Sequence, residues 1–254
     1  MHGTADLSDF FRSWKYDSDN QVRIIKADDG RDVLQIRQPL GVEQYELDGR
    51  PDGQTPEGRS SYLEVFQERL ERHIEENGSE AGFTVSHDDF LLLQNEGLLN
   101  YYRYLVLFQI GDFERTARDT GQNLALCELV EKHAESEEDK KDILQYRPYI
   151  LRMHAISKAM VSLHRQLKST ARQILESAIE EIEKMSPIDT PAFQFERLRS
   201  LNYLRSTLKQ VLEQKASPLD RLKVELEAAI EEENYERAAD LRDRIRALKK
   251  EFEL

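Results

Sequence analysis

The spacing of apolar and polar residues has two different forms along the chain. Three short runs rich in Val, Ile, Leu and Tyr occupy the N-terminal part, at Val22–Lys26, Asp32–Arg37 and Val42–Leu47. Asp29-Gly30 and Pro39-Leu40-Gly41 separate these runs, and glycine accepts the positive φ that a tight hairpin turn requires. This pattern predicts a three-stranded antiparallel β-meander.

The segment that follows, Asp48–Gly58, contains two prolines and three glycines in eleven residues. Such a density of turn residues predicts an irregular loop. Its glycines lack the spacing of a phosphate-binding loop, so we favour a structural role for it. An enzyme with an unrecognised site near this loop is kept as a minor alternative.

From Ser60 onward the apolar residues follow a helical period. Ser61, Ser86 and Ser136 each precede an acidic residue by three positions, which predicts helix N-caps with the hydroxyl accepting a first-turn amide. Thr190-Pro191 and Ser217-Pro218 predict two further helix starts, because proline needs no amide partner at the first helical position. The expected helices span 60–77, 87–110, 112–134, 138–164, 166–185, 191–214, 218–232 and 235–252.

The helical middle shows one weak internal echo and one aromatic stripe. Phe113-x-x-Thr-Ala-Arg118 recurs as Leu167-x-x-Thr-Ala-Arg172, at an offset longer than the usual 34-residue tetratricopeptide repeat. We therefore expect antiparallel helix pairs with at most one tetratricopeptide-like hairpin. Tyr101, Tyr102, Tyr104 and Phe108 form a stripe at helical spacing, which is usually core and occasionally a peptide groove.

The most informative pattern lies in residues 218–254. A first helix places Leu222, Leu226, Ala229 and Ile230 on one face. After the polar stretch Glu231–Asn234, a second helix has apolar residues at Tyr235, Ala238, Leu241, Ile245, Leu248 and Phe252. This spacing predicts an antiparallel helical hairpin with its turn near Glu232–Asn234. Alanines at 228, 229, 238 and 239 would allow close helix approach beside that turn.

The string Asn234–Ile245, Asn-Tyr-Glu-Arg-Ala-Ala-Asp-Leu-Arg-Asp-Arg-Ile, resembles the UVR motif of UvrB and UvrC. In that family the motif is a helical hairpin that docks protein to protein, as between UvrB and UvrC in nucleotide excision repair. The resemblance is confined to the C-terminal segment. It implies a partner-binding face made of Leu222, Leu226, Ile230, Tyr235, Glu236, Ala238, Ala239, Leu241, Arg242, Asp243, Ile245 and Leu248.

The rest of the chain departs from the proteins that carry this motif. It has no Gly-x-x-x-x-Gly-Lys-Ser/Thr loop for an ATPase of the UvrB or ClpC kind and no GIY-YIG-like nuclease pattern. A single cysteine, Cys127, cannot form the paired Cys-x-x-Cys zinc modules of McsA-type activators. The resemblance therefore implies a docking hairpin in this chain, but it does not imply the repair and protease roles of those proteins. Packing of the hairpin on its own chain stays an open alternative.

Composition and charge narrow the function classes further. The 254 residues include 36 Lys and Arg against 49 Asp and Glu, a formal net charge of −13. Arg242, Arg246 and Lys249 form a basic stripe, but acidic residues interrupt it, so we expect weak or no direct nucleic-acid binding. The apolar runs are far shorter than the ~20 residues that span a bilayer. With no secretory signal at the N-terminus, we expect a cytoplasmic protein without membrane association.

Catalytic and metal-binding patterns are not found. None of the six histidines has His-Glu-x-x-His spacing or a neighbouring cysteine, and we expect them to be scattered over the surface. The sequence also lacks a Gly-x-Ser-x-Gly elbow and a dinucleotide-binding glycine turn. We therefore expect no catalytic residues, no cofactor and no metal, and predict that the protein is not an enzyme.

These inferences combine into one prediction. The fold is mainly α (α+β): an antiparallel β-meander and loop at 1–58, an antiparallel helical array at 59–217, and a UVR hairpin at 218–254. The predicted function is a non-catalytic cytoplasmic adaptor that docks a protein partner, or itself as a homodimer, through the hairpin. The helical middle would supply a second surface. The main alternative is an accessory protein of nucleotide excision DNA repair acting through UvrB/UvrC-type contacts.

Overall fold

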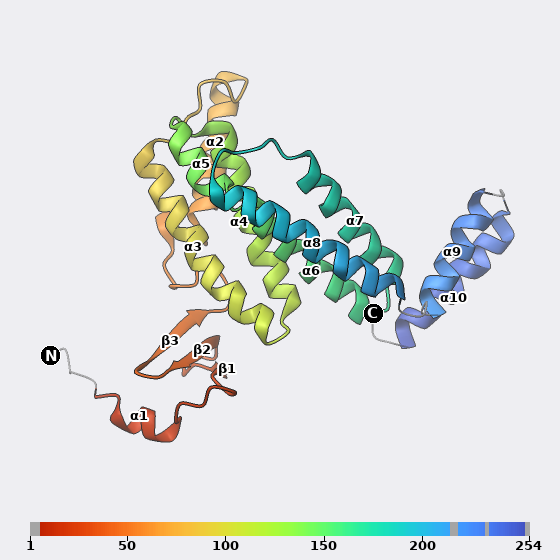
Figure 1. Cartoon of the computed structure of the whole chain (residues 1–254), viewed down its shortest axis with the longest axis horizontal. Helices are drawn as coiled ribbons and strands as arrows, with labels where there is room; N and C mark the ends of the chain where they lie inside the picture. The colour runs from red at the N-terminus through yellow and green to blue at the C-terminus, as the bar shows by residue number, and fades with distance from the viewer. Residues whose placement is uncertain (1–5, 214–217, 232–233, 252–254) are drawn as a thin grey trace.

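A computed structural model describes residues 6–213, 218–231 and 234–251 of the chain (Figure 1). A short helix, α1 (Ser8–Ser13), precedes three strands, β1 (Val22–Lys26), β2 (Asp32–Gln38) and β3 (Gly41–Glu46). A single 3-10 turn, η1, spans Pro56–Gly58. The remaining helices are α2 (Tyr62–Asn77), α3 (His87–Gln109), α4 (Phe113–His133), α5 (Glu137–Leu144), α6 (Arg147–His164), α7 (Lys168–Lys184), α8 (Pro191–Glu213), α9 (Pro218–Glu231) and α10 (Tyr235–Glu251).

The predicted β-meander is confirmed. The three strands pair antiparallel in the order β1-β2-β3, with Leu34 of β2 opposite Ile24 and Tyr45. Gly30 has a φ of 86° in the first turn, a conformation that glycine adopts without strain. Leu34 is fully buried and packs with Leu47 and with Leu107 of α3, so one face of the sheet lies on the end of α3.

The helical array contains two large apolar cores and a smaller cluster around Cys127, Leu144 and Ile150. Successive long helices pack against each other, α3 on α4, α4 on α6, α6 on α7 and α7 on α8, and α8 also packs back on α6. One core joins α2, α3 and α4 around Phe66 and Phe90, and the other joins α6, α7 and α8 around Leu175 and Leu204. Figure 1 shows the sheet at one end of this array and the α9–α10 hairpin projecting at the opposite end.

The predicted N-caps are also confirmed where the structure describes them. Ser61, Ser86 and Ser136 each accept a hydrogen bond from the amide three residues later, at the starts of α2, α3 and α5. The hydroxyl of Thr190 accepts from the amide of Phe193 at 3.2 Å. Ser217 lies outside the described residues. Local hydrogen bonding thus sets these helix starts, as the sequence pattern indicated.

The single helix predicted over 138–164 is wrong, because the chain breaks at Gln145–Tyr146 and forms α5 and α6 instead. Pro148 sits in the first turn of α6. Its ring would clash with the carbonyl of Leu144 in a continuous helix, and it has no amide to donate. Helix α1 and the 3-10 turn were not predicted either. Both elements are too short for the spacing of their apolar residues to show a helical period.

A buried arginine joins the sheet to the helices. Arg103 of α3 is inaccessible to solvent and donates two hydrogen bonds, of 2.7 and 2.8 Å, to the carboxylate of Asp119 on α4, which is also fully buried. Its remaining terminal nitrogen donates to the backbone carbonyls of Glu46 and Gly49, each at 2.8 Å. Arg118 adds hydrogen bonds to Asp119 at 2.9 Å and to the carbonyl of Leu47 at 2.5 Å.

A second buried ion pair fixes the loop and the start of α2. Arg50, with 2% of its side chain exposed, donates to Glu96 of α3 at 2.8 Å and to Asp52 at 2.8 Å. The Glu96 carboxylate also accepts the first-turn amides of Tyr62 and Leu63, at 2.6 and 3.0 Å. Glu96 therefore caps a helix from a distance, because a carboxylate at a helix N-terminus meets both free amides and the positive end of the helix dipole.

Replacing Asp119 with Asn should destabilise the whole fold. The variant keeps the shape of the side chain but leaves the Arg103 guanidinium buried without its counter-charge, which costs about 3–5 kcal/mol in comparable pairs. Urea denaturation followed by circular dichroism measures this loss. The matched control is Glu180→Gln, whose carboxylate pairs with Lys184 at 3.2 Å and is 67% exposed. That control should change stability by less than about 1 kcal/mol, and equal losses in both variants would contradict the prediction.

Candidate docking hairpin

The turn of the C-terminal hairpin is organised by Asn234. Its own amide donates to the carbonyl of Ala229 at 2.8 Å, which closes the end of α9. Its side-chain oxygen accepts the amide of Arg237 at 3.2 Å, and its carbonyl accepts the amide of Ala238 at 3.0 Å. Asn234 is therefore the N-cap of α10. The other two residues of the predicted turn, 232–233, lie outside the described residues.

The seam between α9 and α10 is narrow. Ala229, Leu241 and Ile245 are buried, with 1%, 2% and 9% of their surface exposed. Ala229 supplies a small side chain opposite the larger ones, so the two helices approach closely at this level. Leu241 and Ile245 belong to the predicted face, and four other members of that face are only half-buried: Leu222, Leu226, Ala238 and Leu248. The predicted apolar seam is thus present, but most of its leucine surface is incompletely covered.

The remaining residues of the predicted face are exposed. They are Ile230, Tyr235, Glu236, Ala239, Arg242 and Asp243. Ile230 in the last turn of α9 is 53% exposed and Tyr235 at the first position of α10 is 71% exposed. These two large apolar residues flank the turn, and we call them the hairpin tip. Of the predicted face, two residues are therefore buried in the seam, four are half-buried and six are exposed, and the tip is the large apolar part of the exposed set.

The charges of the hairpin lie on its surface and hold it together only weakly. Arg237 of α10 lies 4.0 Å from Glu225 of α9, and both side chains are about half exposed. On α10, Arg244 pairs with Asp240 at 3.8 Å and Arg246 with Asp243 at 4.0 Å. Exposed pairs of this kind contribute about 0–1 kcal/mol each. The arginines of α10 alternate with aspartates, so the described part of the helix presents no continuous basic stripe.

Within the described residues, α9 and α10 pack extensively only on each other. Figure 1 shows the pair standing away from the helical array, beyond the end of α8. Among the described residues, the array therefore makes few contacts with the hairpin. An apolar stripe left in this state gains free energy from any surface that removes it from water, at about 25 cal/mol per Å².

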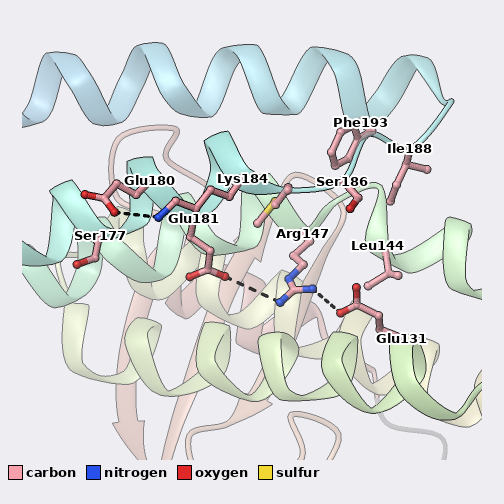
Figure 2. Close-up of a pocket in the computed structure, with 11 residues that line it drawn as sticks. Glu131, Leu144, Arg147, Ser177, Glu180, Glu181, Lys184, Ser186, Ile188 and Phe193 are labelled. Carbon is pink, nitrogen blue, oxygen red and sulfur yellow. Dashed lines mark hydrogen bonds and ion pairs between the residues drawn. The ribbon is translucent and has the colours of Figure 1, made fainter.

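A pocket of about 550 Å³ lies between α4, α6, α7 and the start of α8 (Figure 2). Arg147 crosses it, with a terminal nitrogen 2.5 Å from Glu131 and another 3.9 Å from Glu181. Beside it, Lys184 pairs with Glu180. The charged side chains of this pocket therefore pair with one another, but the Nε atom of Arg147 is buried without a hydrogen-bond partner among the described residues.

The groups that sequence reasoning considered for chemistry are held in structural contacts. Arg50 and Asp52 of the Asp48–Gly58 loop are engaged in the ion pairs described above. Burial raises the pKa of the Cys127 thiol to about 12, so it is protonated and unreactive at neutral pH. Among the described residues, no group of three or more His, Cys, Asp or Glu side chains could hold a metal ion. No described helix is long and apolar enough to cross a membrane.

The expectation that the histidines are surface residues is wrong for two of them. His133 is 7% exposed, and its ring packs edge-on against Phe83 with centroids 5.2 Å apart. His154 is partly buried, and its Nδ1 lies 3.0 Å from the hydroxyl of Thr120. Burial lowers the pKa of His154, which favours its neutral form. An imidazole fits such helix interfaces because a neutral ring buries apolar surface while one nitrogen keeps a hydrogen bond.

Comparison with known protein families identifies the hairpin. Residues 217–251 match the UvrB/uvrC motif, the UVR family. The match confirms the resemblance drawn from the Asn234–Ile245 string, and it covers a minor part of the chain. Neither the comparison with curated proteins nor that with solved structures gave a significant match.

Replacing Asn234 with Ala should loosen α10 without affecting the helical array. Loss of an N-cap typically costs about 1 kcal/mol. Because α9 and α10 pack mainly on each other, that loss should stay local. Hydrogen exchange measured residue by residue should show faster exchange in the first turn of α10, at Arg237 and Ala238. The amides of α4 serve as the internal reference, and a general acceleration there would show that the hairpin is an integral part of the core.

Proposed function

We propose that the protein is a non-catalytic adaptor that docks a protein partner, or a second copy of itself, through the UVR hairpin. The observation that carries this proposal is the exposed hairpin tip, Ile230 and Tyr235, next to a half-buried leucine stripe on a hairpin that packs extensively only on itself among the described residues. The UVR motif is a protein-interaction module, which agrees with this use of the surface.

The size of the hairpin supports the same conclusion. Two helices of this length are below the size that usually folds alone, because they bury too little apolar surface to offset the loss of chain entropy. A partner helix that covers Leu222, Leu226 and Leu248 would complete a small helical core. Binding would then stabilise the hairpin as well as recruit the partner.

The body of the protein fits the role of a rigid support. Its buried ion pairs and caps hold the meander and helices in one arrangement, whereas the hairpin extends from the end of α8. A cytoplasmic location is part of the proposal, because the chain has one buried cysteine and depends on no disulfide among its described residues. The helical array is available as a second binding surface.

The second candidate function is an accessory role in nucleotide excision DNA repair. The motif match favours it, because the UVR motif is associated with UvrB/UvrC-type contacts. The two candidates differ in the partner that the hairpin captures. A helicase or nuclease partner identified in a pull-down that depends on residues 218–254 supports the repair role. A protease or kinase partner supports regulation of protein turnover.

The double variant Ile230→Ser/Tyr235→Ser should abolish docking without affecting the fold. Each side chain contributes roughly 1.5–3 kcal/mol if the partner buries it fully, so the dissociation constant should rise at least tenfold. Analytical ultracentrifugation measures self-association, and pull-down with the purified full chain measures partner capture. Both residues are exposed, so the melting temperature should not change.

A matched substitution elsewhere on α9 controls for charge and surface effects. Arg221 is exposed, and Arg221→Gln should leave capture unchanged. Ala238→Leu tests the seam independently, because overpacking costs roughly 1–3 kcal/mol and should reduce capture while the body keeps its melting temperature. If the tip variant retained full self-association and full capture, the docking proposal would be wrong.

Direct DNA binding should be negligible at physiological salt. The net charge of −13 repels phosphate, and aspartates separate the arginines of α10. A fluorescence-anisotropy titration with a short labelled duplex at ~150 mM salt, where phosphate contacts are already weakened, checks this. Sub-micromolar affinity would contradict this expectation. It would favour a role in DNA repair with direct DNA contact over the adaptor role.

A further inference from the structure

The two outer strands of the sheet differ in how far the rest of the chain covers them. The edge at β3 is covered at its end, because the amide of Glu46 donates to the carbonyl of Pro51 at 2.9 Å. The carbonyl of Glu46 also accepts a hydrogen bond from Arg103 at 2.8 Å. The other outer strand, β1, packs extensively only on β2 among the described elements. The outward side of β1 is therefore left open.

The hydrogen-bond pattern shows which residues of β1 face this open side. In an antiparallel pair, every second residue exchanges hydrogen bonds with the neighbouring strand, and the residues between them direct their amides and carbonyls away from it. The carbonyl of Gln21 accepts the amide of Arg37 at 2.8 Å, and the amide of Ala27 donates to the carbonyl of Arg31 at 2.8 Å. These bonds at the two ends of β1 assign its odd-numbered residues to β2. The outward-facing residues, which we call the open edge, are Val22, Ile24 and Lys26.

The open edge offers both backbone groups and apolar surface. Within the part of the chain that the structure describes, no residue forms a hydrogen bond with the outward-facing amides and carbonyls of this edge. The side chain of Ile24, at the middle of the edge, is 41% exposed. A row of unpaired amides and carbonyls beside an exposed apolar side chain is a template on which another strand can pair.

The two cations of β1 are held towards the sheet and do not block this edge. Lysine on an edge strand commonly prevents pairing, because its charge would be desolvated by the incoming strand. Here the Nζ atom of Lys26 lies 2.9 Å from the carboxylate of Asp32, its opposite residue on β2. The guanidinium of Arg23 donates to the side-chain oxygen of Gln35 on β2 at 2.9 and 2.7 Å. Both side chains therefore reach across the sheet towards β2.

The sequence of β1 is complementary to itself. Antiparallel pairing of two copies over the full strand places Ile24 of one copy opposite Ile24 of the other. Arg23 then faces Ile25. Val22 faces Lys26, so no cation faces a cation, and each outward-facing residue meets another in a hydrogen-bonded pair. A shift that brings Arg23 opposite Arg23 sets like charges against each other, which destabilises a sheet. Full overlap and charge therefore select the same register, with a two-fold axis at Ile24.

We propose that the open edge pairs with the open edge of a second copy of this chain, so that two three-stranded meanders form one continuous antiparallel sheet. A two-fold dimer of this kind is closed, because the same edge is used by both copies. An acidic strand from another protein gains little from Lys26, whose charge is already paired with Asp32. The sheet and the UVR hairpin lie at opposite ends of the helical array (Figure 1), so this interface is distinct from the docking proposed for the hairpin.

A cysteine at the two-fold axis tests the register directly. Opposite Cα atoms in a hydrogen-bonded antiparallel pair lie about 5.5 Å apart, within the ~4.4–6.8 Å that a disulfide spans. The full chain with Ile24→Cys should therefore form a covalent dimer under mild oxidation, measured by non-reducing electrophoresis. The native Cys127 is fully buried and does not compete.

The matched control for this cross-link is Leu40→Cys, in the turn between β2 and β3. Position 40 is 95% exposed, so random collision favours cross-linking there over position 24. We expect Ile24→Cys to cross-link at least about tenfold faster, because pairing of the strands holds its two thiols together. Equal or faster cross-linking of Leu40→Cys overturns the proposal.

Opposite charges at the same position test whether the occupant is a second copy. Ile24→Lys and Ile24→Glu each place like charges opposite each other at the axis, so either variant alone should self-associate at least about tenfold more weakly. An equimolar mixture should restore the dimer, because lysine then faces glutamate. Circular dichroism checks that both variants fold. The cross-link at Ile24→Cys decides the test if either does not, and a mixture of folded variants that stays monomeric overturns the proposal.

The sheet edge and the hairpin are tested separately. Sedimentation measurements of the edge use the full chain that carries Ile230→Ser/Tyr235→Ser, so that association through the hairpin does not contribute. This chain should show a monomer–dimer equilibrium at roughly 10–500 µM, because one strand pair makes an interface below the standard size. A chain that stays monomeric over this range overturns the proposal. Partner capture by the hairpin should be the same in Ile24→Lys as in the parent chain, so failure at one surface does not decide the other.

Discussion

The guanidinium of Arg103 is fully buried, and four oxygen atoms surround it. Two belong to Asp119 on the neighbouring helix, and two are the backbone carbonyls of Glu46, the last residue of β3, and Gly49 in the loop that follows. A charge in this position is stabilised only if every one of these partners stays in place. The requirement fixes α3 against α4 and fixes the sheet against both, so that the N-terminal meander is held as part of the helical body.

A second buried carboxylate in the body also has several partners. Glu96 neutralises Arg50 and also accepts two amides at the start of α2, so one carboxylate positions a loop, a helix and an arginine. As a result, Arg50 and Asp52 of the 48–58 loop, where an unrecognised catalytic site was considered, are held in ion pairs. Rigidity of this kind suits a scaffold on which other surfaces are displayed.

The hairpin is a surface that the body of the protein leaves with little cover. Its seam buries Leu241 and Ile245 but leaves Ile230 and Tyr235 exposed. An apolar surface laid on these side chains would remove them from water, which is the physical basis of the docking proposal.

The sequence by itself determined the features that depend on neighbours within about one helical turn. The serine caps, the Asp-Gly turn of the meander, and the hairpin with its buried Leu241 and Ile245 follow from hydrogen bonds and periods that are local in the chain. Pro148 was also a local signal, and the break before α6 follows from it. Half of the predicted docking face, including Arg242 and Asp243, is exposed, because periodicity identifies a face but not how far one partner helix covers it. Only the tertiary structure decided that Glu96, Arg103 and Asp119 are buried. Each of these groups resembles an ordinary helical surface residue until the fold brings its partners together, because the cost of burying a charge depends on distant atoms that no local pattern specifies.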